Sequence, residues 1–291
     1  METIKVKSFH CFYIKSVFRR LSVVMHRLIT VLLFIWSITD QPVGAIEPIQ
    51  LSKPIQLTVL SYNIHHCEGV DGKLDLQRIA NVIANVRPDL VALQEVDNKT
   101  TRTLDVDQAN EIALMTRMQF VFGANIELQG GSYGNAVLSK LPIKGHRNEL
   151  LQSVGAGEQR GVLVGEIELP ESRGTLRLFA THFDHRRDGT ERRQSATAIN
   201  KMVLTDQSPA ILMGDLNDVL GSDTLQRLHH VWKPTVDRPL PTIPVVNPKR
   251  QIDFVLAYPP PRWRVIETRV IEETLASDHR PIVCKLQLLP D

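Results

Sequence analysis

Polar side chains recur where apolar, strand-like runs of this chain end, and their types suit one kind of chemistry. Carboxylates, carboxamides and histidines can together hold a divalent cation and bind the oxygens of a phosphate ester. Strand ends can hold such side chains rigidly at one rim, so the recurrence predicts a single convergent site. In chain order these residues are Asn63, Glu95, His182, Asp215, Asn217, Asp253, Asp278 and His279.

The segment Gly214-Asp215-Leu216-Asn217 shows how the local sequence could place two of them. In extended backbone, residues two apart point to the same side, so Asp215 and Asn217 would address one spot while Leu216 faces the core. The carboxylate could then position a water molecule, and the amide could hold a phosphoryl oxygen. A turn is the competing interpretation, since Asp and Asn both favour turns.

Glu95 follows the apolar run Leu90–Gln94. A carboxylate at the edge of a core needs compensation from a metal or an arginine, because burying an unpaired charge is costly. An exposed strand end is the alternative. Asn63 closes an earlier apolar run 32 residues before Glu95, which leaves room for a crossover helix. The two side chains would then end side by side at one sheet edge.

His182 closes another apolar run, and His185, Arg186 and Arg193 follow it. Together these residues form a positive cluster suited to phosphate. A solvated surface is the alternative for the arginines. Arg160, directly before a strand, is a further candidate for contact with phosphate, so Arg160 and Arg186 are the predicted substrate-binding residues.

Two histidine-containing segments remain. The adjacent Asp278 and His279 could touch a metal and a phosphate jointly, or one could tune a partner elsewhere, with a surface loop as the alternative. The run His65-His66-Cys67 suggests zinc, but the sequence holds no second ligand cluster of matching spacing. A zinc site is therefore not expected there.

Extended and helical patterns alternate along the chain without strict βαβ order, which favours two packed sheets flanked by helices over a parallel barrel. A capping Asp75 precedes a helical apolar face, and five prolines mark residues 233–249 as a loop. Strands are expected over residues 57–64, 89–96, 120–126, 135–139, 161–169, 175–181, 210–214, 252–257, 263–271 and 281–288, and helices over 76–86, 108–118, 191–204 and from 223.

The first 45 residues differ from the rest. Basic residues precede the apolar run Leu28–Ile38, whose 11 residues are too few to span a bilayer comfortably. Val43 and Ala45 then occupy the positions of a small-residue cleavage site. The pattern predicts a signal peptide over residues 1–45, with Met25 as the true start, and an exported catalytic domain over residues 46–291, periplasmic or secreted. A signal anchor is the alternative.

Charge and cysteine content narrow the function further. Residues 1–45 carry six Lys or Arg and two acids, a net +4, so the remainder of this +2 chain is near 2 − 4 = −2. Such a body attracts polyanions weakly, which argues against a non-specific nucleic-acid binder but allows a local basic groove. Outside the leader, Cys67 and Cys284 are too few for a disulfide framework; unpaired thiols are favoured, and one bond between them stays open.

Taken in order, the polar residues resemble the endonuclease/exonuclease/phosphatase superfamily over about Leu57–Leu289. The resemblance implies a four-layer α/β sandwich of two mixed, mostly antiparallel sheets flanked by helices, with the site at one rim. It implies that Glu95 and Asn63 hold Mg²⁺ or Mn²⁺, with Asp278 near the same ion. It further implies that Asp215 activates water, Asn217 binds a phosphoryl oxygen, His182 and His279 hold the scissile phosphate, with His279 paired to an acid as a base, and Asp253 orients His182.

The expected function is therefore a Mg²⁺-dependent phosphoric-ester hydrolase acting on a small or lipid-borne phosphodiester or a sugar phosphate. The chain lacks the aromatic-rich or Lys-rich insertions of duplex-binding members, and residues 182–194 and 134–138 look more like exported bacterial hydrolases of the superfamily. A secreted nuclease acting on DNA or RNA is one alternative, and a non-catalytic binding module is another. Neither an obligate protein partner nor a transmembrane span in the mature chain is expected.

Overall fold

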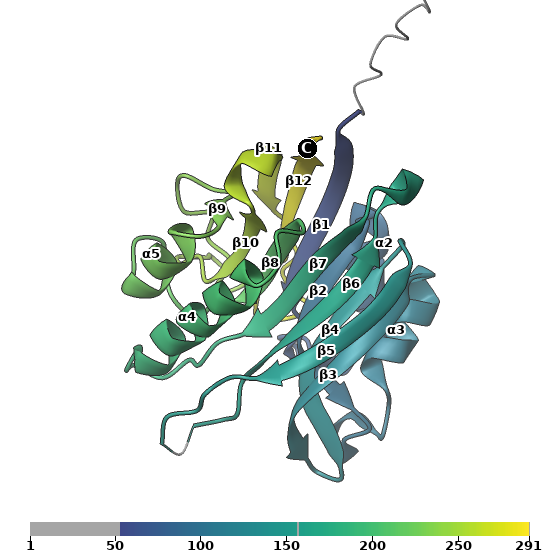
Figure 1. Cartoon of the computed structure of the whole chain (residues 1–291). Coiled ribbons are helices and arrows are strands. Elements are labelled where there is room, and N and C mark those ends of the chain that lie inside the picture. The colour runs from purple at the N-terminus through teal and green to yellow at the C-terminus, as the bar shows by residue number, and fades with distance from the viewer. Residues whose placement is uncertain (1–52, 156, 291) are drawn as a thin grey trace, which may run out of the picture. The chain divides into compact units, whose positions relative to one another are not determined.

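Two six-stranded sheets face each other across a shared apolar core (Figure 1). The computed structural model describes residues 53–155 and 157–290. The first sheet has the order β11-β12-β1-β2-β4-β3, and the second has the order β5-β6-β7-β8-β10-β9. The strands are β1 (Ile55–Asn63), β2 (Leu90–Asn98), β3 (Gln119–Leu128), β4 (Gly131–Ser139), β5 (Ile143–Leu150), β6 (Gly161–Glu168), β7 (Thr175–His182), β8 (Ala210–Asp215), β9 (Lys233–Pro234), β10 (Asp253–Tyr258), β11 (Trp263–Val270) and β12 (Ile282–Leu288).

Helices cover the outer face of each sheet. The helices α2 (Leu76–Val86) and α3 (Gln108–Thr116) pack on the first sheet, and α4 (Thr190–Leu204) and α5 (Asp223–His229) pack on the second (Figure 1). Asp75 caps α2 by accepting a hydrogen bond from the Arg78 N–H, as its position in the sequence predicts. Each helix pair closes its own apolar layer, so the predicted four-layer α/β sandwich is confirmed.

The strand β5 was not predicted. Its sequence IKGHRNEL has few apolar side chains, and most of its residues are half-buried or exposed because it lies at the edge of the second sheet. An edge strand pairs with only one neighbour and is more exposed to solvent, so it needs few apolar side chains. The predicted loop over residues 233–249 also holds the short strand β9 at its start.

Parallel pairing brings the polar strand ends to one rim. β1 pairs in parallel with β2 in the first sheet, and β7 pairs in parallel with β8 in the second. His182 lies directly opposite Asp215 in that register, and Asp253, at the start of antiparallel β10, lies opposite Asp215 on the other side. Residues far apart in the chain are therefore neighbours before any side-chain interaction is considered.

Gly214 allows the close approach of β7 and β8 beneath the rim. A Cβ atom at this position would lie 2.0 Å from the Thr181 carbonyl oxygen, whereas at Gly165 it would lie 3.5 Å from its nearest neighbour, Val137 Cγ1. We therefore expect Gly214→Ala to lower the free energy of unfolding by about 1–3 kcal/mol, the usual cost of overpacking. Chemical denaturation measures this, with Gly165→Ala as the matched control; equal stabilities of the two variants would contradict the packing assignment.

Other expectations concern the termini, the membrane and the thiols. The predicted signal peptide, the start at Met25 and the cleavage after Ala45 lie outside the described residues. Within the described part of the chain, no helix is both long and apolar enough to cross a membrane. Cys67 and Cys284 are buried and unpaired, so the bond between them that the sequence left open does not form.

Candidate active site

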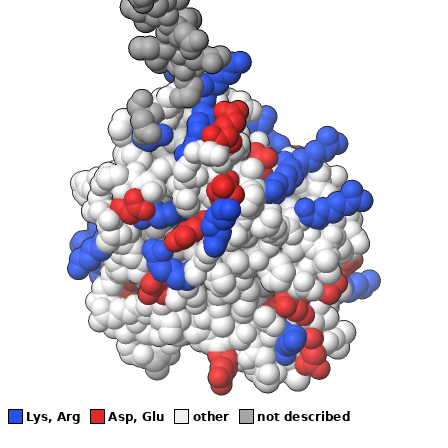
Figure 2. Space-filling model, turned by 45° about the vertical axis from the view of Figure 1, so that its right-hand side comes forward, with Lys and Arg blue, Asp and Glu red and all other residues white. Residues whose placement is uncertain are grey.

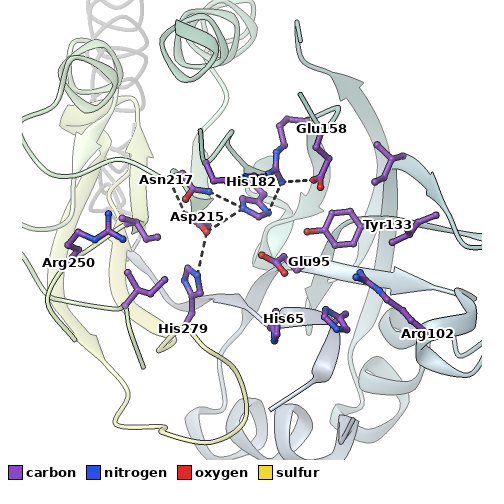
Figure 3. Close-up of a pocket in the computed structure, with 17 residues that line it drawn as sticks. His65, Glu95, Arg102, Tyr133, Glu158, His182, Asp215, Asn217, Arg250 and His279 are labelled. Atoms are coloured by element: carbon purple, nitrogen blue, oxygen red, sulfur yellow. Dashed lines mark hydrogen bonds and ion pairs between the residues drawn. The ribbon is translucent and has the colours of Figure 1, made fainter. Parts of the chain in front are cut away.

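A cavity of about 560 Å³ opens at the rim where the polar strand ends meet (Figure 3). Both sheets contribute to its walls, together with the segments that follow β1, β8 and the 233–249 loop. Six of the residues predicted from sequence line it: Glu95, Arg160, His182, Asp215, Asn217 and His279. The others that line it are His65, His66, Arg102, Ile126, Leu128, Tyr133, Glu158, His185, Ile243, Arg250 and Ile252.

Asp215 is the carboxylate around which the site is built. Its Oδ2 atom accepts a hydrogen bond from Asn63 Nδ2 at 3.2 Å and lies 3.4 Å from His182 Nε2 and 3.7 Å from His279 Nε2. Burial raises the pKa of Asp215 to about 7, although the nearby His279 acts in the opposite direction. A carboxylate with such a pKa can take up a proton near neutral pH, as a general base must.

Asn217 lies beside Asp215 through a turn. Its backbone is left-handed, with φ of 48°, and its N–H donates to Asp215 Oδ1 at 2.9 Å. Leu216 between them is fully buried in the core. The turn interpretation is therefore correct and the extended backbone expected at Asn217 is wrong, but the turn itself directs Asp215 and Asn217 to the cavity. The Asn217 amide is 3.0 Å from His182 Nε2 and donates to the Phe183 carbonyl oxygen at 3.0 Å.

Asp253 orients His279, so the expectation that it would orient His182 is wrong. His279 Nδ1 donates to Asp253 Oδ2 at 2.9 Å, and the Thr242 hydroxyl donates to the same oxygen at 2.5 Å. Burial lowers the pKa of His279, but the carboxylates of Asp253 and Asp215 outweigh it and raise the pKa to about 10. His279 is therefore an imidazolium cation at neutral pH.

His182 has a different environment, because a buried arginine lies behind it. Arg160, only 3% exposed, places Nη1 3.1 Å from His182 Nδ1 and Nη2 3.3 Å from His185 Nδ1. A guanidinium has no acceptor, so each Nδ1 accepts from Arg160. Burial and the charge of Arg160 lower the pKa of His182 well below its usual range. His182 is therefore neutral, whereas His279 is a cation.

Glu95 lies within β2, and the expectation that it would end the strand is wrong. Its backbone is left-handed, with φ of 59°, where the pairing of β2 with β4 shifts register between Leu93 and Val96. Such bulges re-aim a side chain next to a site. One carboxylate oxygen, Oε1, accepts from Asn63 Nδ2 at 2.9 Å, and within residues 53–155 and 157–290 Glu95 has no ion-pair partner. A half-buried carboxylate without a cationic side chain fits a bound cation.

Besides Asp253, three predicted residues do not line the cavity. Asn63 is buried beneath it, with Oδ1 accepting from the His65 N–H. Asp278 is half-buried and does not line the cavity, with Oδ1 3.4 Å from the Ser277 hydroxyl. Arg186 does not line it either, because its guanidinium donates to Asp184 and Glu191. The assigned roles of these residues stay predictions.

Sequence reasoning missed the two histidines after β1. His65 and His66 line the cavity, while Cys67, the third residue of that run, is buried in the core under α2. Zinc ligands in sequence motifs come in paired clusters of regular spacing, and no second cluster follows this run. The third ligand candidate, Glu95, belongs to the neighbouring strand, so only the parallel register of β1 and β2 brings the three together.

Comparisons with known proteins agree with this geometry. The sequence profile of the Endonuclease/Exonuclease/phosphatase family matches residues 60–279. The uncharacterised protein YbhP of Escherichia coli K12 is 26% identical over 258 residues, which is 79% of this chain and 96% of YbhP. A 5'-tyrosyl-DNA phosphodiesterase of Caenorhabditis elegans is 27% identical over 176 residues, covering 57% of this chain and 44% of that enzyme. Among solved structures, a mannosyl-6-phosphatase of Bacteroides thetaiotaomicron superposes with a TM-score of 0.66 at 17% identity, covering 79% of this chain and 99% of that chain.

Proposed function

The chain belongs to the endonuclease/exonuclease/phosphatase family, whose members hydrolyse phosphoric esters, and we propose that it is a divalent-cation-dependent hydrolase with water as nucleophile. The observation that carries the proposal is the position of Asp215. One buried carboxylate lies against a neutral His182, a cationic His279 and the amide of Asn63. This combination supplies a base and donors within one cavity, as in-line attack on phosphorus requires.

Separate roles follow from the protonation states. Asp215, with a pKa of about 7, takes the proton of the attacking water. The imidazolium of His279, held by Asp253, neutralises a phosphoryl oxygen, and the neutral His182 lies between Arg160 and Asp215. The Asn217 amide binds another phosphoryl oxygen. Because Asp253 makes His279 a cation, we assign His279 to charge stabilisation rather than to the base.

The cation belongs to the Glu95 side of the cavity. Glu95 is the residue we assign to hold Mg²⁺ or Mn²⁺, with Asn63 and Asp278 as the further predicted ligands. A bound divalent cation withdraws charge from the phosphate and makes the phosphorus more electrophilic. The Asn63 amide donates to Glu95 and to Asp215, which keeps the cation-binding carboxylate next to the base.

For the substrate, we favour a small or lipid-borne phosphodiester or a sugar phosphate over a nucleic acid. A cavity of about 560 Å³ suits a small group. On the face that Figure 2 draws, basic and acidic residues are interspersed rather than gathered into the band that a polyanion requires. One structurally similar protein is a mannosyl-6-phosphatase, and one sequence relative is a 5'-tyrosyl-DNA phosphodiesterase. Both phosphomonoesters and phosphodiesters are therefore candidate substrates. Export of the chain is part of the same proposal.

Removal of the cation tests the proposal. We expect EDTA, or Glu95→Gln with Mg²⁺ present, to lower turnover of bis-p-nitrophenyl phosphate at least about 100-fold, because the carboxylate is the main charged ligand. Glu272→Gln is the matched control, since Glu272 is exposed and does not line the cavity.

Parallel assays on plasmid DNA and sphingomyelin separate the alternatives. Rapid cleavage of plasmid DNA would favour the secreted nuclease. Activity that survives EDTA and Glu95→Gln would contradict the cation assignment, and no turnover of any phosphate ester would favour the binding module.

A further inference from the structure

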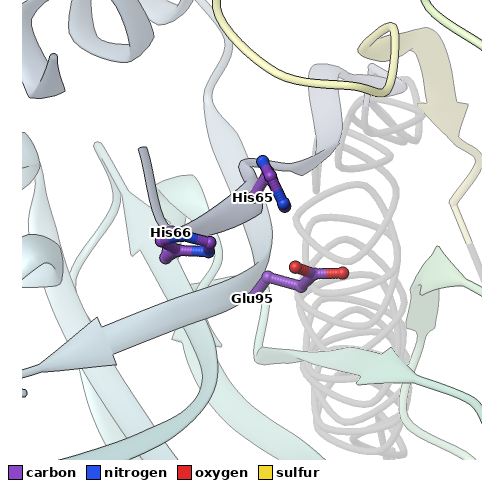
Figure 4. Close-up of side chains that lie close together, drawn as sticks. All are labelled: His65, His66 and Glu95. Atoms are coloured by element: carbon purple, nitrogen blue, oxygen red, sulfur yellow. The ribbon is translucent and has the colours of Figure 1, made fainter. Parts of the chain in front are cut away.

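Two histidines and a glutamate form a cluster at the floor of the cavity (Figure 4). His65 and His66 belong to the short 3₁₀ turn η1 (His65–Cys67) after β1, and Glu95 belongs to the bulge of β2. One ring nitrogen of each histidine and one carboxylate oxygen lie within 4.8 Å of one another. Oε1 of Glu95 already accepts from Asn63, so the other oxygen remains available.

The tautomer of His65 suits a metal ligand. Its Nδ1 atom lies 3.0 Å from the Glu68 carbonyl oxygen, which can only accept, so Nδ1 carries the proton. The lone pair is therefore on Nε2. Metal-binding histidines usually donate their other ring N–H to a carbonyl or carboxylate in this way, which fixes both the tautomer and the orientation of the ring.

His66 carries a nitrogen that the chain itself does not satisfy. Its side chain is 12% exposed, and Nε2 lies 3.6 Å from a carboxylate oxygen of Glu68. Nδ1 is buried with no hydrogen-bond partner in the described part of the chain. With the proton on Nε2 towards Glu68, Nδ1 needs a partner from outside the chain.

The backbone is strained where these histidines lie. His65, His66 and Cys67 are three consecutive left-handed residues, with φ of 45°, 42° and 64°. This conformation is unfavourable for residues other than glycine, because Cβ approaches the following carbonyl oxygen. In a continued strand, adjacent side chains would point to opposite faces. Here both imidazoles lie beside Glu95, so the strain produces a convergence of nitrogen donors.

We propose that His65, His66 and Glu95 form a nitrogen-rich cation site that binds a Zn²⁺-class transition ion more tightly than Mg²⁺. Imidazole suits Zn²⁺ and Co²⁺, whereas Mg²⁺ prefers oxygen ligands and retains its water. Two histidines and a carboxylate also leave a fourth position for water or a substrate oxygen. No zinc site was expected here because the sequence holds no second ligand cluster of matching spacing, and Glu95 supplies the third ligand from the neighbouring strand. The inference rests on the proposed function, because it replaces the Mg²⁺ or Mn²⁺ assigned there to Glu95 with a Zn²⁺-class ion at the same carboxylate.

Metal binding to the full chain tests the site directly. After EDTA treatment and dialysis, titration calorimetry is run with Zn²⁺ and with Mg²⁺ on the wild type, His65→Ala and His66→Ala. We expect each substitution to weaken Zn²⁺ binding at least about tenfold and to change Mg²⁺ binding less. His146→Ala is the matched control, because His146 is exposed on β5, outside the cavity. Zn²⁺ affinities within twofold of wild type in both variants would overturn the proposal.

A spectroscopic measurement on the wild type tests the site even if a variant does not fold. Electron paramagnetic resonance of the wild type with one equivalent of Cu²⁺ should show hyperfine coupling to imidazole nitrogen, and an oxygen-only signature would overturn the site. Neither measurement requires turnover. A chain that binds Zn²⁺ through His65 and His66 but hydrolyses no ester would refute the proposed function alone, whereas a hydrolase whose Zn²⁺ binding ignores these histidines would refute the site alone.

Discussion

Asp215→Asn is expected to lower kcat on bis-p-nitrophenyl phosphate by about 10³-fold, within the range that a general base contributes. The substitution keeps the size of the side chain and an oxygen that can accept the Asn217 N–H. It removes the negative charge between His182 and His279 and the ability to take up a proton. Steady-state kinetics with saturating divalent cation measure the loss.

The control for this prediction is Asp237→Asn, which removes an exposed carboxylate from the 233–249 loop outside the cavity. Its kcat should stay within about twofold of wild type, because isolated surface substitutions have small effects. Thermal unfolding of both variants shows whether the fold is intact. If kcat of a folded Asp215→Asn protein fell less than tenfold, Asp215 would not be the general base.

His279→Gln is expected to lower kcat by about 10²–10³-fold, comparable with the loss of one preorganised donor to the transition state. The sign of the pH dependence follows from its charge. With a pKa of about 10, His279 is protonated below that pH, so activity should persist at neutral pH and fall as pH rises through the pKa. At the acidic end, activity should rise as Asp215 loses its proton near pH 7.

Asp253→Asn tests whether activity depends on the positive charge of His279 or only on its imidazole ring. The substitution removes the carboxylate that holds Nδ1 at 2.9 Å, so the pKa of His279 should decrease and the alkaline limb should move to lower pH. His146→Gln is the control for the histidine substitution. An alkaline limb at the same pH in Asp253→Asn would show that another group titrates there, and would contradict the assignment of His279 as the cation.

The positions of the site residues were predictable, because strand ends are visible as apolar runs followed by a polar residue. Asn63, His182 and Asp215 all close the strands that the sequence predicts. The parallel pairs β1–β2 and β7–β8 then bring them to one rim. The cap and apolar face of α2 were equally visible, since capping and helical periodicity are local properties.

Pairing between site residues was not predictable in the same way. Asp253 meets His279 because β10 runs antiparallel to β8 and the 233–249 loop returns the chain to the rim. No local sequence pattern predicts the antiparallel pairing of β10 with β8 or the path of the 233–249 loop. Glu95 shows a similar limit: an apolar run followed by a carboxylate reads as a strand end, whereas the chain inserts a bulge and continues to Asn98.

Arginines were the least predictable residues, because their long side chains choose partners through space. Arg160 is buried against His182 and Glu158, whereas Arg186 donates to Asp184 and Glu191. Both were predicted from the sequence to contact phosphate. The difference depends on which carboxylates the fold places within reach of each guanidinium.

The amide of Asn63 donates at once to Glu95 in the first sheet and to Asp215 in the second, at 2.9 and 3.2 Å. The proposed cation ligand and the proposed base therefore belong to different sheets, and the Asn63 carboxamide joins them by hydrogen bonds. Any sliding of the sheets would change the separation of cation and nucleophile, and this crosslink resists it. Asn63 thus fixes the distance between Glu95, the proposed cation ligand, and Asp215, the proposed base, before a substrate binds.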